Sequence, residues 1–192
     1  IRWDAGLHET WTPGEAGALA QLASLADGAL ASYGGGRNRP ARPQTSRLSP
    51  YLHFGELGPR QCLAAARNAV AERPAAQASA DRFVREIGWR EFAHHLLHHF
   101  PHTPTSPLDT RFDAFPWEPN DAWVEAWQRG RTGYPIVDAG MRELWHTGWM
   151  HNRVRMIAAS FLIKHLLIDW REGERWFWDT LVDADYGSNA VN

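Results

Sequence analysis

The sequence predicts an all-helical fold. Apolar residues recur at three- and four-residue spacing in several separate segments, which is the pattern of helices that bury one face. No segment shows a convincing alternation of apolar and polar residues, so no strand is expected. The chain has 192 residues, of which 44% are hydrophobic, and this is enough for a sizeable core.

The first predicted helix follows Thr12-Pro13-Gly14-Glu15, which has the form of a capping box with proline at the first helical position. Leucine and alanine then recur at helical spacing as far as Tyr33. The glycines at 34–36 are expected to end this helix. The arginine- and proline-rich residues 37–50 are expected to form a loop.

The remaining helices are predicted from their caps and their apolar spacing. Ser79 is expected to cap a long helix that stops at Phe100, before Pro101. Proline and polar residues make 103–120 an extended loop. The other helices are expected at 58–72 and at about 121–129, 136–146, 149–167 and 172–181.

The composition narrows the class of protein. A net charge of −2 does not indicate a nucleic-acid-binding protein, although arginines from separate segments can still form a local basic face. The single cysteine, Cys62, excludes a disulfide framework and favours a reducing compartment. No apolar run is long enough to span a membrane and no signal peptide is evident. Because the chain opens at Ile1 and stops at Asn192 after an acidic loop, both ends are expected to lie within a longer protein.

Polar residues interrupt the apolar pattern near residue 150. At helical spacing Asn152, Arg155 and Met156 share a face, with Trp149 one turn before them. An amide and a guanidinium on one face suit a planar, polar, partly anionic ligand. The alternative is the exposed end of a surface helix.

The segment 45–52 places hydroxyls and an arginine in a loop that enters a structured turn. Thr45, Ser46 and Ser49, with free backbone N–H groups, can form a cradle for an anion, and Arg47 can add a bidentate phosphate contact. The alternative is ordinary capping chemistry, because hydroxyl-rich helix entries are common.

Two further segments carry carboxylates in a pattern that favours a site. Glu86, Trp89 and Arg90 are either an intrahelical ion pair beside a packed indole, or a carboxylate and an indole that face a substrate while the arginine faces a phosphate. Asp183 and Asp185 lie in a segment that lacks the remaining ligands of a calcium loop. In an irregular segment two carboxylates at this spacing can face different partners, so Asp183 is expected to pair with an arginine such as Arg155. Asp185 and Asn189 are expected to bond the N–H or carbonyl edge of a ligand.

The histidines and tryptophans each admit two interpretations. The run at 94–99 has the i, i+4 histidine spacing that binds zinc, but no third ligand follows, so these are interpreted as surface or packed histidines and no metal is predicted. Eleven tryptophans exceed what packing requires. They indicate stacking on bases or on a flavin, or electron transfer, with an aromatic core or a protein interface as the alternative.

In chain order, these segments resemble the flavin-binding domain of the DNA photolyase/cryptochrome family, most closely the class I cyclobutane pyrimidine dimer photolyases of bacteria. The resemblance implies a helical FAD-binding domain that is partial over 1–192, with 1–36 as its leading helix after an interdomain linker. The α/β antenna domain, with its folate or deazaflavin, is expected outside the chain. The motifs that carry the resemblance are TSRLSPYLHFGEL, FVREIGWREF, GRTGYPIVDAGMRELWHTGWMHNRVRM, LLIDWREGERWFW and LVDADYGSN.

The resemblance implies a set of residues around FAD. Tyr33 and the loop 45–49 are similar to residues that hold the pyrophosphate and ribityl region. The stretch 183–185 is similar to residues along the flavin and adenine, and Asn189 to the amide at the flavin N5. The full implied set is Tyr33, Thr45, Ser46, Arg47, Leu48, Ser49, Phe83, Arg90, Asn152, Arg155, Asp183, Ala184, Asp185 and Asn189.

The resemblance also implies light-driven repair of DNA that contains pyrimidine dimers, by a monomer of the bacterial cytoplasm that associates with the nucleoid. The dimer would be extruded from the duplex before it is bound. The alternatives are a cryptochrome photoreceptor and a non-catalytic helical interaction module. The implied DNA and substrate residues are Arg37, Glu86, Trp89, Arg90, Asn152, Arg153 and Met156. The implied catalytic and electron-transfer residues are Glu86, Asn189, Trp117 and Trp170, with the innermost tryptophan expected beyond Asn192.

Overall fold

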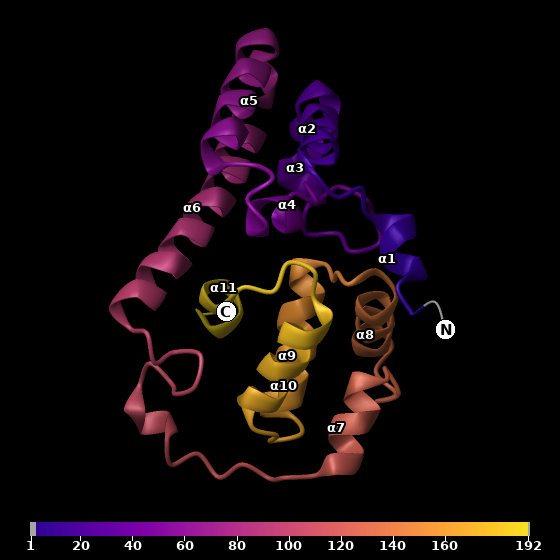
Figure 1. The fold of residues 1–192 in the computed structure, drawn as a ribbon, viewed down its shortest axis with the longest axis vertical. Coiled ribbons are helices and arrows are strands. Elements are labelled where there is room, and N and C mark those ends of the chain that lie inside the picture. The colour runs from indigo at the N-terminus through magenta and orange to yellow at the C-terminus, as the bar shows by residue number, and fades with distance from the viewer. Residues whose placement is uncertain (1–2, 192) are drawn as a thin grey trace. The chain divides into compact units, whose positions relative to one another are not determined.

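The computed structural model describes residues 3–191, and every regular element in that range is a helix (Figure 1). The predicted all-helical class is therefore confirmed. The chain divides into two compact units: unit 1 extends to Phe92 and unit 2 begins at Ala93. The division falls inside the long helix α6 (Gln77–His99).

Unit 1 is built from short helices that enclose a leucine- and aromatic-rich core. That core contains Leu22, Leu30, Leu48 and Phe83, all less than a tenth exposed. Leu48 is thereby fixed in the core although it belongs to the predicted anion-binding loop. The elements of this unit are α1 (Ala5–Thr10), α2 (Glu15–Ser24), a π-helical turn (Leu25–Ala29), α3 (Leu30–Gly36), α4 (Ser49–His53), α5 (Pro59–Glu72), a 3₁₀ turn (Pro74–Ala76) and the first part of α6.

The predicted capping box at the start of α2 is wrong. The helix begins at Glu15, and its N-cap is Gly14, whose φ of 97° favours glycine. The Gly14 N–H donates to Glu56 Oε1 at 2.8 Å, so a distant carboxylate takes the place of the expected Thr12 hydroxyl. The physical reason lies at Gly17, where a Cβ would come 2.0 Å from the Thr12 carbonyl oxygen. The backbone of Thr12 is packed against the helix that its side chain was expected to cap.

Ser79 is also not an N-cap, because α6 begins two residues earlier. Its hydroxyl accepts a hydrogen bond from Gly34 N–H at 3.2 Å and donates to the Ala31 carbonyl at 2.9 Å. A Cβ at Gly34 would lie 2.9 Å from this hydroxyl, so glycine permits the close approach of α3 to α6. The glycines at 34–36 were expected to end the helix, and α3 ends at Gly36, the last of them.

Unit 2 contains the end of α6, a long connection and five further helices of the described chain. The connection spans 103–120 and has one 3₁₀ turn at Thr110–Phe112, close to the predicted extended loop. The helices are α7 (Asp121–Gln128), α8 (Pro135–Thr147), α9 (Asn152–Lys164), α10 (Trp170–Thr180) and α11 (Tyr186–Val191). The helices predicted at 121–129, 136–146 and 172–181 are therefore confirmed to within two residues.

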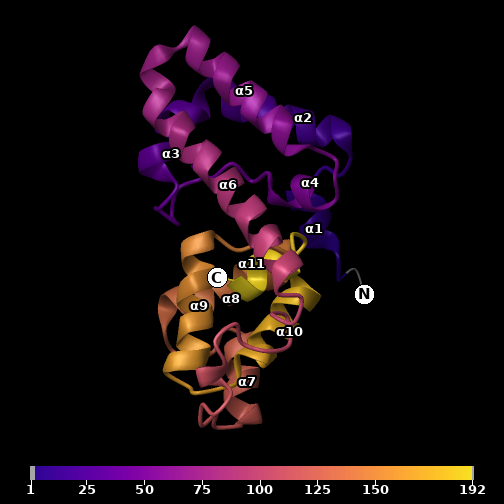
Figure 2. The same cartoon turned by 90° about the vertical axis from the view of Figure 1, so that its left-hand side faces the viewer.

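The core of unit 2 is centred on Trp127. This indole is fully buried, and its N–H donates to the Ala158 carbonyl at 2.9 Å. Both α8 and α10 pack against α9 around it (Figure 2). Together they fix the direction of α9, which carries several of the predicted site residues. In residues 3–191 no helix is long and apolar enough to cross a membrane.

The helix predicted at 149–167 is shorter at both ends. Gly148, with a φ of 67°, caps the end of α8, so the chain turns before a new helix begins. His151 is the N-cap of α9, and its Nδ1 accepts from the Arg153 N–H at 3.1 Å. The helix ends at Lys164, before Leu167 adopts a φ of 54°.

Candidate functional site

A buried ion pair joins α9 to the segment before α11. Arg155 Nη2 lies 2.8 Å from Asp183 Oδ2, and the Asp183 side chain is only 3% exposed. Arg155 Nε also donates to the Met150 carbonyl at 2.8 Å. The predicted pairing of Asp183 with Arg155 is therefore confirmed. Two fixed hydrogen bonds hold this guanidinium in one orientation.

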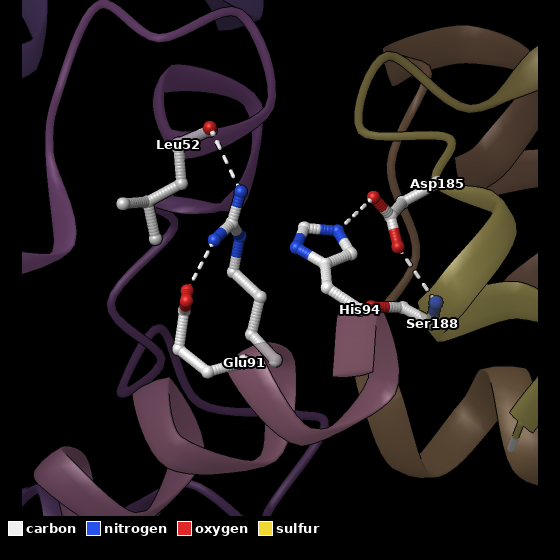
Figure 3. Close-up of polar contacts among 6 residues, drawn as sticks. Leu52, Glu91, His94, Asp185 and Ser188 are labelled. Carbon is white, nitrogen blue, oxygen red and sulfur yellow. Dashed lines mark hydrogen bonds and ion pairs between the residues drawn. The ribbon is translucent and has the colours of Figure 1, made fainter. Parts of the chain in front are cut away.

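The second carboxylate of the segment has different partners, a histidine and a backbone N–H that the sequence did not predict. Asp185 Oδ2 lies 2.7 Å from His94 Nε2, and Asp185 Oδ1 accepts from the Ser188 N–H at 2.6 Å (Figure 3). Burial opposes ionisation of Asp185, but the hydrogen bonds from His94 and Ser188 outweigh it and hold the pKa of this carboxyl below its usual value. The carboxylate therefore stays ionised at neutral pH.

Two buried polar atoms in this cluster have no hydrogen-bond partner among the described residues. They are Asp183 Oδ1, an acceptor, and Asn189 Nδ2, a donor. Asn189 lies in the first turn of α11, where its backbone N–H donates to the Asp185 carbonyl at 2.8 Å. Ala184, between the two aspartates, is buried in the core of unit 2. Buried polar groups are normally paired, so these two atoms indicate the position of a polar ligand.

The polar face predicted on α9 is divided in the structure. Asn152 and Met156 are both exposed, and Arg153 Nη1 reaches Met156 Sδ at 3.6 Å. Arg155 does not share this surface, because it turns toward Asp183. Trp149 precedes the helix and is 93% buried, so it is a packed indole and not the wall of an open pocket. The exposed amide and thioether remain available to a ligand.

In unit 1, Glu86 is paired, but not with Arg90. Arg37 Nη2 lies 2.6 Å from Glu86 Oε2, and the Arg37 side chain is only 12% exposed. The same guanidinium lies 5.8 Å from the centre of the Tyr33 ring, which meets Phe83 edge to face at 5.6 Å. Burial raises the pKa of the Tyr33 phenol above its usual value. Arg37 is therefore a positioning group for Glu86 rather than a freely exposed arginine.

Arg90 has partners within unit 1 that the sequence did not reveal. Its Nη1 pairs with the neighbouring Glu91 at 2.5 Å, and its Nη2 donates to the Leu52 carbonyl at 3.4 Å (Figure 3). Trp89 is 59% exposed and meets Phe92, itself 45% exposed, edge to face at 5.8 Å. An exposed indole beside a second exposed aromatic ring offers a stacking surface.

The predicted anion-binding loop of unit 1 is ordered by contacts at both ends. The Ser46 carbonyl accepts from Gln21 Nε2 at 3.0 Å, and Ser49 begins α4. Arg47 has a φ of 51°, a conformation uncommon outside glycine, and its guanidinium lies 5.5 Å from the Trp11 ring centre. Thr45 and Ser46 are partly exposed. The role of this loop in holding a phosphate stays a prediction.

The two tryptophans predicted to transfer electrons lie in neighbouring segments of unit 2. Trp117 and Trp170 are both partly exposed. The Glu118 N–H donates to the Leu167 carbonyl at 2.8 Å, which links the segment of the first indole to the connection just before the second. Trp117 packs on Phe115 with ring centres 4.3 Å apart, and the Arg171 guanidinium lies 6.0 Å from the Trp170 ring centre.

The histidine run at the end of α6 does not form a metal site in the structure. His95 and His99 have ring centres 4.4 Å apart, while His94 is engaged with Asp185. Across residues 3–191 no three side chains of the metal-ligating types converge. His94 is the partner of Asp185 that the sequence analysis missed, because only the fold brings it to a carboxylate 91 positions away.

Comparisons with known proteins agree with this arrangement. Residues 83–192 match the FAD binding domain of DNA photolyase. A deoxyribodipyrimidine photo-lyase of Agrobacterium fabrum is 55% identical over 99% of the chain and 39% of its own length. Cryptochrome-2 of Arabidopsis thaliana is 43% identical over 95% of the chain and 31% of its own length.

The solved structure of a bacterial class III photolyase from Agrobacterium tumefaciens superposes with a TM-score of 0.95 and 54% identity. The match covers 98% of the chain and 39% of that structure, so the chain spans about two fifths of this relative. The similarity is to a photolyase of class III, so the expected class I affiliation gains no support from it. The chain belongs to the DNA photolyase/cryptochrome family, and FAD is the cofactor of the domain that it matches.

Proposed function

We propose that the chain forms the flavin-binding part of an enzyme that uses light to split cyclobutane pyrimidine dimers in DNA. The family assignment and the similarity to deoxyribodipyrimidine photo-lyases support this proposal. Because the chain spans only 39% of such a relative, the activity is proposed for the whole protein of which these residues form the cofactor domain.

One observation carries the cofactor part of the proposal. The buried acceptor Asp183 Oδ1 and the buried donor Asn189 Nδ2 lack partners in the described chain, and both lie in the segment that ends in α11. The isoalloxazine edge of FAD presents ring N–H groups, carbonyl oxygens and an acceptor nitrogen, so it can satisfy one donor and one acceptor at once. The residues present therefore fit the cofactor.

FAD, when bound in its reduced form, supplies on illumination the electron that breaks the cyclobutane ring. The residues of unit 2 would bind and orient it. Arg155 neutralises Asp183, which leaves the outer carboxylate oxygen free to accept a hydrogen bond from the ligand. Asn189 provides an amide that can hydrogen-bond without adding negative charge. Burial of these two atoms, Asp183 Oδ1 and Asn189 Nδ2, keeps water from competing for these bonds.

The substrate part of the proposal concerns exposed groups in each unit. In unit 1, Trp89 offers a stacking face for an extruded pyrimidine, and Glu86, held by Arg37, offers a carboxylate to a base edge. In unit 2, the exposed Asn152 offers an amide, and Arg153 offers a charge for a phosphate. Each of these contacts is a proposal supported by residue type, exposure and family resemblance.

The experiment compares repair of a thymine-dimer oligonucleotide in light and in darkness. The proteins are the flavin-loaded wild type, Trp89→Ala, and the control Trp123→Ala, which removes an indole of similar exposure from α7. Stacking on an aromatic ring is worth about 1–3 kcal/mol per base, so Trp89→Ala should weaken binding of dimer-containing DNA by roughly 10- to 100-fold. Undamaged DNA and the Trp123→Ala protein should show little change.

Three results would contradict the proposal in different ways. A flavin-loaded protein that shows no repair in light would favour a cryptochrome-type photoreceptor, the alternative to which the 43% identity with Cryptochrome-2 points. A protein that binds no FAD would favour a non-catalytic helical module. Equal loss of binding to damaged and undamaged DNA in Trp89→Ala would make that indole structural.

A further inference from the structure

We propose that His94 is a positioning residue for the flavin edge of the domain: it holds Asp185, and through Asp185 it fixes the first turn of α11 and the Asn189 amide. The inference rests on the proposed function, because its readout is the binding of FAD. It assigns a role to a residue that neither the family motif nor the histidine pattern singled out.

The contact that carries the inference is short and joins two elements of unit 2. His94 Nε2 lies 2.7 Å from Asp185 Oδ2, with the two side chains 35% and 22% exposed. The other oxygen of the same carboxylate accepts from the Ser188 N–H at 2.6 Å. Figure 3 shows both bonds converging on Asp185. One carboxylate therefore connects the end of α6 to the beginning of α11.

The packing at Gly187 is independent evidence that α11 is held against α6. A Cβ at Gly187 would lie 3.0 Å from His94 Cδ2 and 3.1 Å from the Ala93 carbonyl oxygen. A side chain at 187 could fit only if these neighbours moved by a few tenths of an ångström, so the histidine ring and the glycine backbone are closely packed. Glycine at 187 thus lets α11 lie close enough to α6 for His94 to reach Asp185.

A second contact holds α11 from the side of α10. Tyr186, the first residue of α11, stacks on Trp178 with ring centres 3.9 Å apart and an angle of 10° between the planes. The stack limits movement along one direction, and the His94–Asp185 bond limits it along another. The short helix is therefore fixed by two contacts from neighbouring elements rather than by its own length, since a helix this short is not stable alone.

The contact between His94 and Asp185 also positions Asn189, which is proposed to face the flavin. Asn189 N–H donates to the Asp185 carbonyl at 2.8 Å, so the backbone of Asn189 is attached to the residue that His94 holds. The Nδ2 atom of the partly buried Asn189 is itself buried and has no partner in the described chain. Loss of the His94 bond would release Asp185 and let the amide leave its position.

The test compares two substitutions at His94 with a control at the next residue. His94→Leu removes the hydrogen bond, whereas His94→Gln retains a donor of similar reach. His95→Leu is the control, because His95 is exposed and its ring contact is with His99. A hydrogen bond to a charged group is worth about 1.5–3 kcal/mol, so His94→Leu should weaken FAD binding at least about tenfold. His94→Gln should recover most of that loss, and His95→Leu should bind as the wild type does.

The second readout is amide hydrogen exchange of Ser188 and Asn189 in the FAD-free protein. His94→Leu should lose protection at both amides, and His94→Gln should keep it. If the leucine variant does not fold, Gly187→Ala provides the same test, because the added methyl would separate α11 from His94 and should likewise weaken FAD binding and protection.

The outcomes separate this inference from the proposed function. A wild type that binds no FAD would overturn the proposed function, while hydrogen exchange would still decide whether His94 fixes α11. A wild type that binds FAD, with His94→Leu binding equally well, would overturn the positioning role. A glutamine variant as weak as the leucine variant would also overturn it, because the bond to Asp185 would then not be what matters.

Discussion

Breaking the Arg155–Asp183 pair should be among the most destabilising single changes in unit 2. At 2.8 Å and an effective dielectric constant of about 20, the gross attraction between the two charges is about 6 kcal/mol. Desolvation offsets part of this gain, but a single substitution leaves the other charge without its partner. With Asp183 only 3% exposed, Asp183→Ala should therefore lower the free energy of unfolding by about 3–5 kcal/mol.

The assay is urea unfolding of the FAD-free protein at neutral pH, followed by the fluorescence of the tryptophans, which include the fully buried Trp127. Arg155→Ala and the double variant complete a mutant cycle, in which the coupling energy should exceed about 2 kcal/mol. The matched control is the exposed pair between Glu172 and Arg175, whose coupling should stay within about 1 kcal/mol. Equal coupling for the two pairs would refute the argument that burial makes the first one strong.

Three further predictions concern other residues. Burial raises the pKa of Asp138, but hydrogen bonds from Thr132 and Gly133 outweigh it and hold the pKa below its usual value. The ionised Asp138 therefore stabilises the fold above about pH 4, and this contribution is lost as the pH falls through the folded-state pKa. Asp138→Ala should cost about 2–4 kcal/mol of unfolding free energy at pH 7 and less at pH 3; a loss that is the same at both pH values would contradict this. Trp117→Phe and Trp170→Phe should each slow photoreduction of oxidised FAD in the full-length protein, while repair by the chemically reduced enzyme should not change. Normal photoreduction in both variants would show that these indoles serve packing only. Asn189→Asp should lower the midpoint potential of bound FAD, measured by redox titration, because a carboxylate disfavours the anionic reduced form. An unchanged potential would show that Asn189 does not contact the flavin edge.

The long helices could be predicted from the sequence because each has many apolar positions and recognisable ends. The α5, α7, α8 and α10 helices lie nearly where the spacing indicated. The short helices α1, α4 and α11 were missed, since five or six residues carry less than two turns of periodicity. Their positions depend on tertiary contacts, such as the stack of Tyr186 on Trp178, which local spacing does not encode.

The caps failed for a related reason. Thr12 and Ser79 both had the residue type and position of an N-cap, yet Ser79 is used in contact with another helix, and the Thr12 backbone packs against the helix that its side chain was expected to cap. A hydroxyl satisfies a backbone donor equally well within its own helix or across to a neighbour, so residue type alone does not distinguish the two uses. The difference is decided by glycines, at 17 and 34, that let a second backbone approach.

The candidate site was predictable in its residue types and less so in its pairings. Motif resemblance placed Arg155 opposite Asp183, and the structure confirms that pair. One of the two alternatives for Glu86 placed its partner one helical turn away at Arg90, whereas the structure provides Arg37 from the end of α3. Helical spacing measures only neighbours on one helix, so a partner from another element is invisible to it.

Polar atoms without a hydrogen-bond partner are more informative about the proposed ligand than those that are already paired within the protein. Asp183 and Asp185 have four carboxylate oxygens between them, and three of these are paired, with Arg155, His94 and the Ser188 N–H. The fourth oxygen, on Asp183, and the Asn189 amide are left over in a buried place where an unpaired polar atom is costly. A ring edge with its own N–H and acceptor atoms would pair with both atoms without displacing any bond that the protein already makes. The paired groups thus hold the site in shape, and the two unpaired atoms define the chemistry of what enters it.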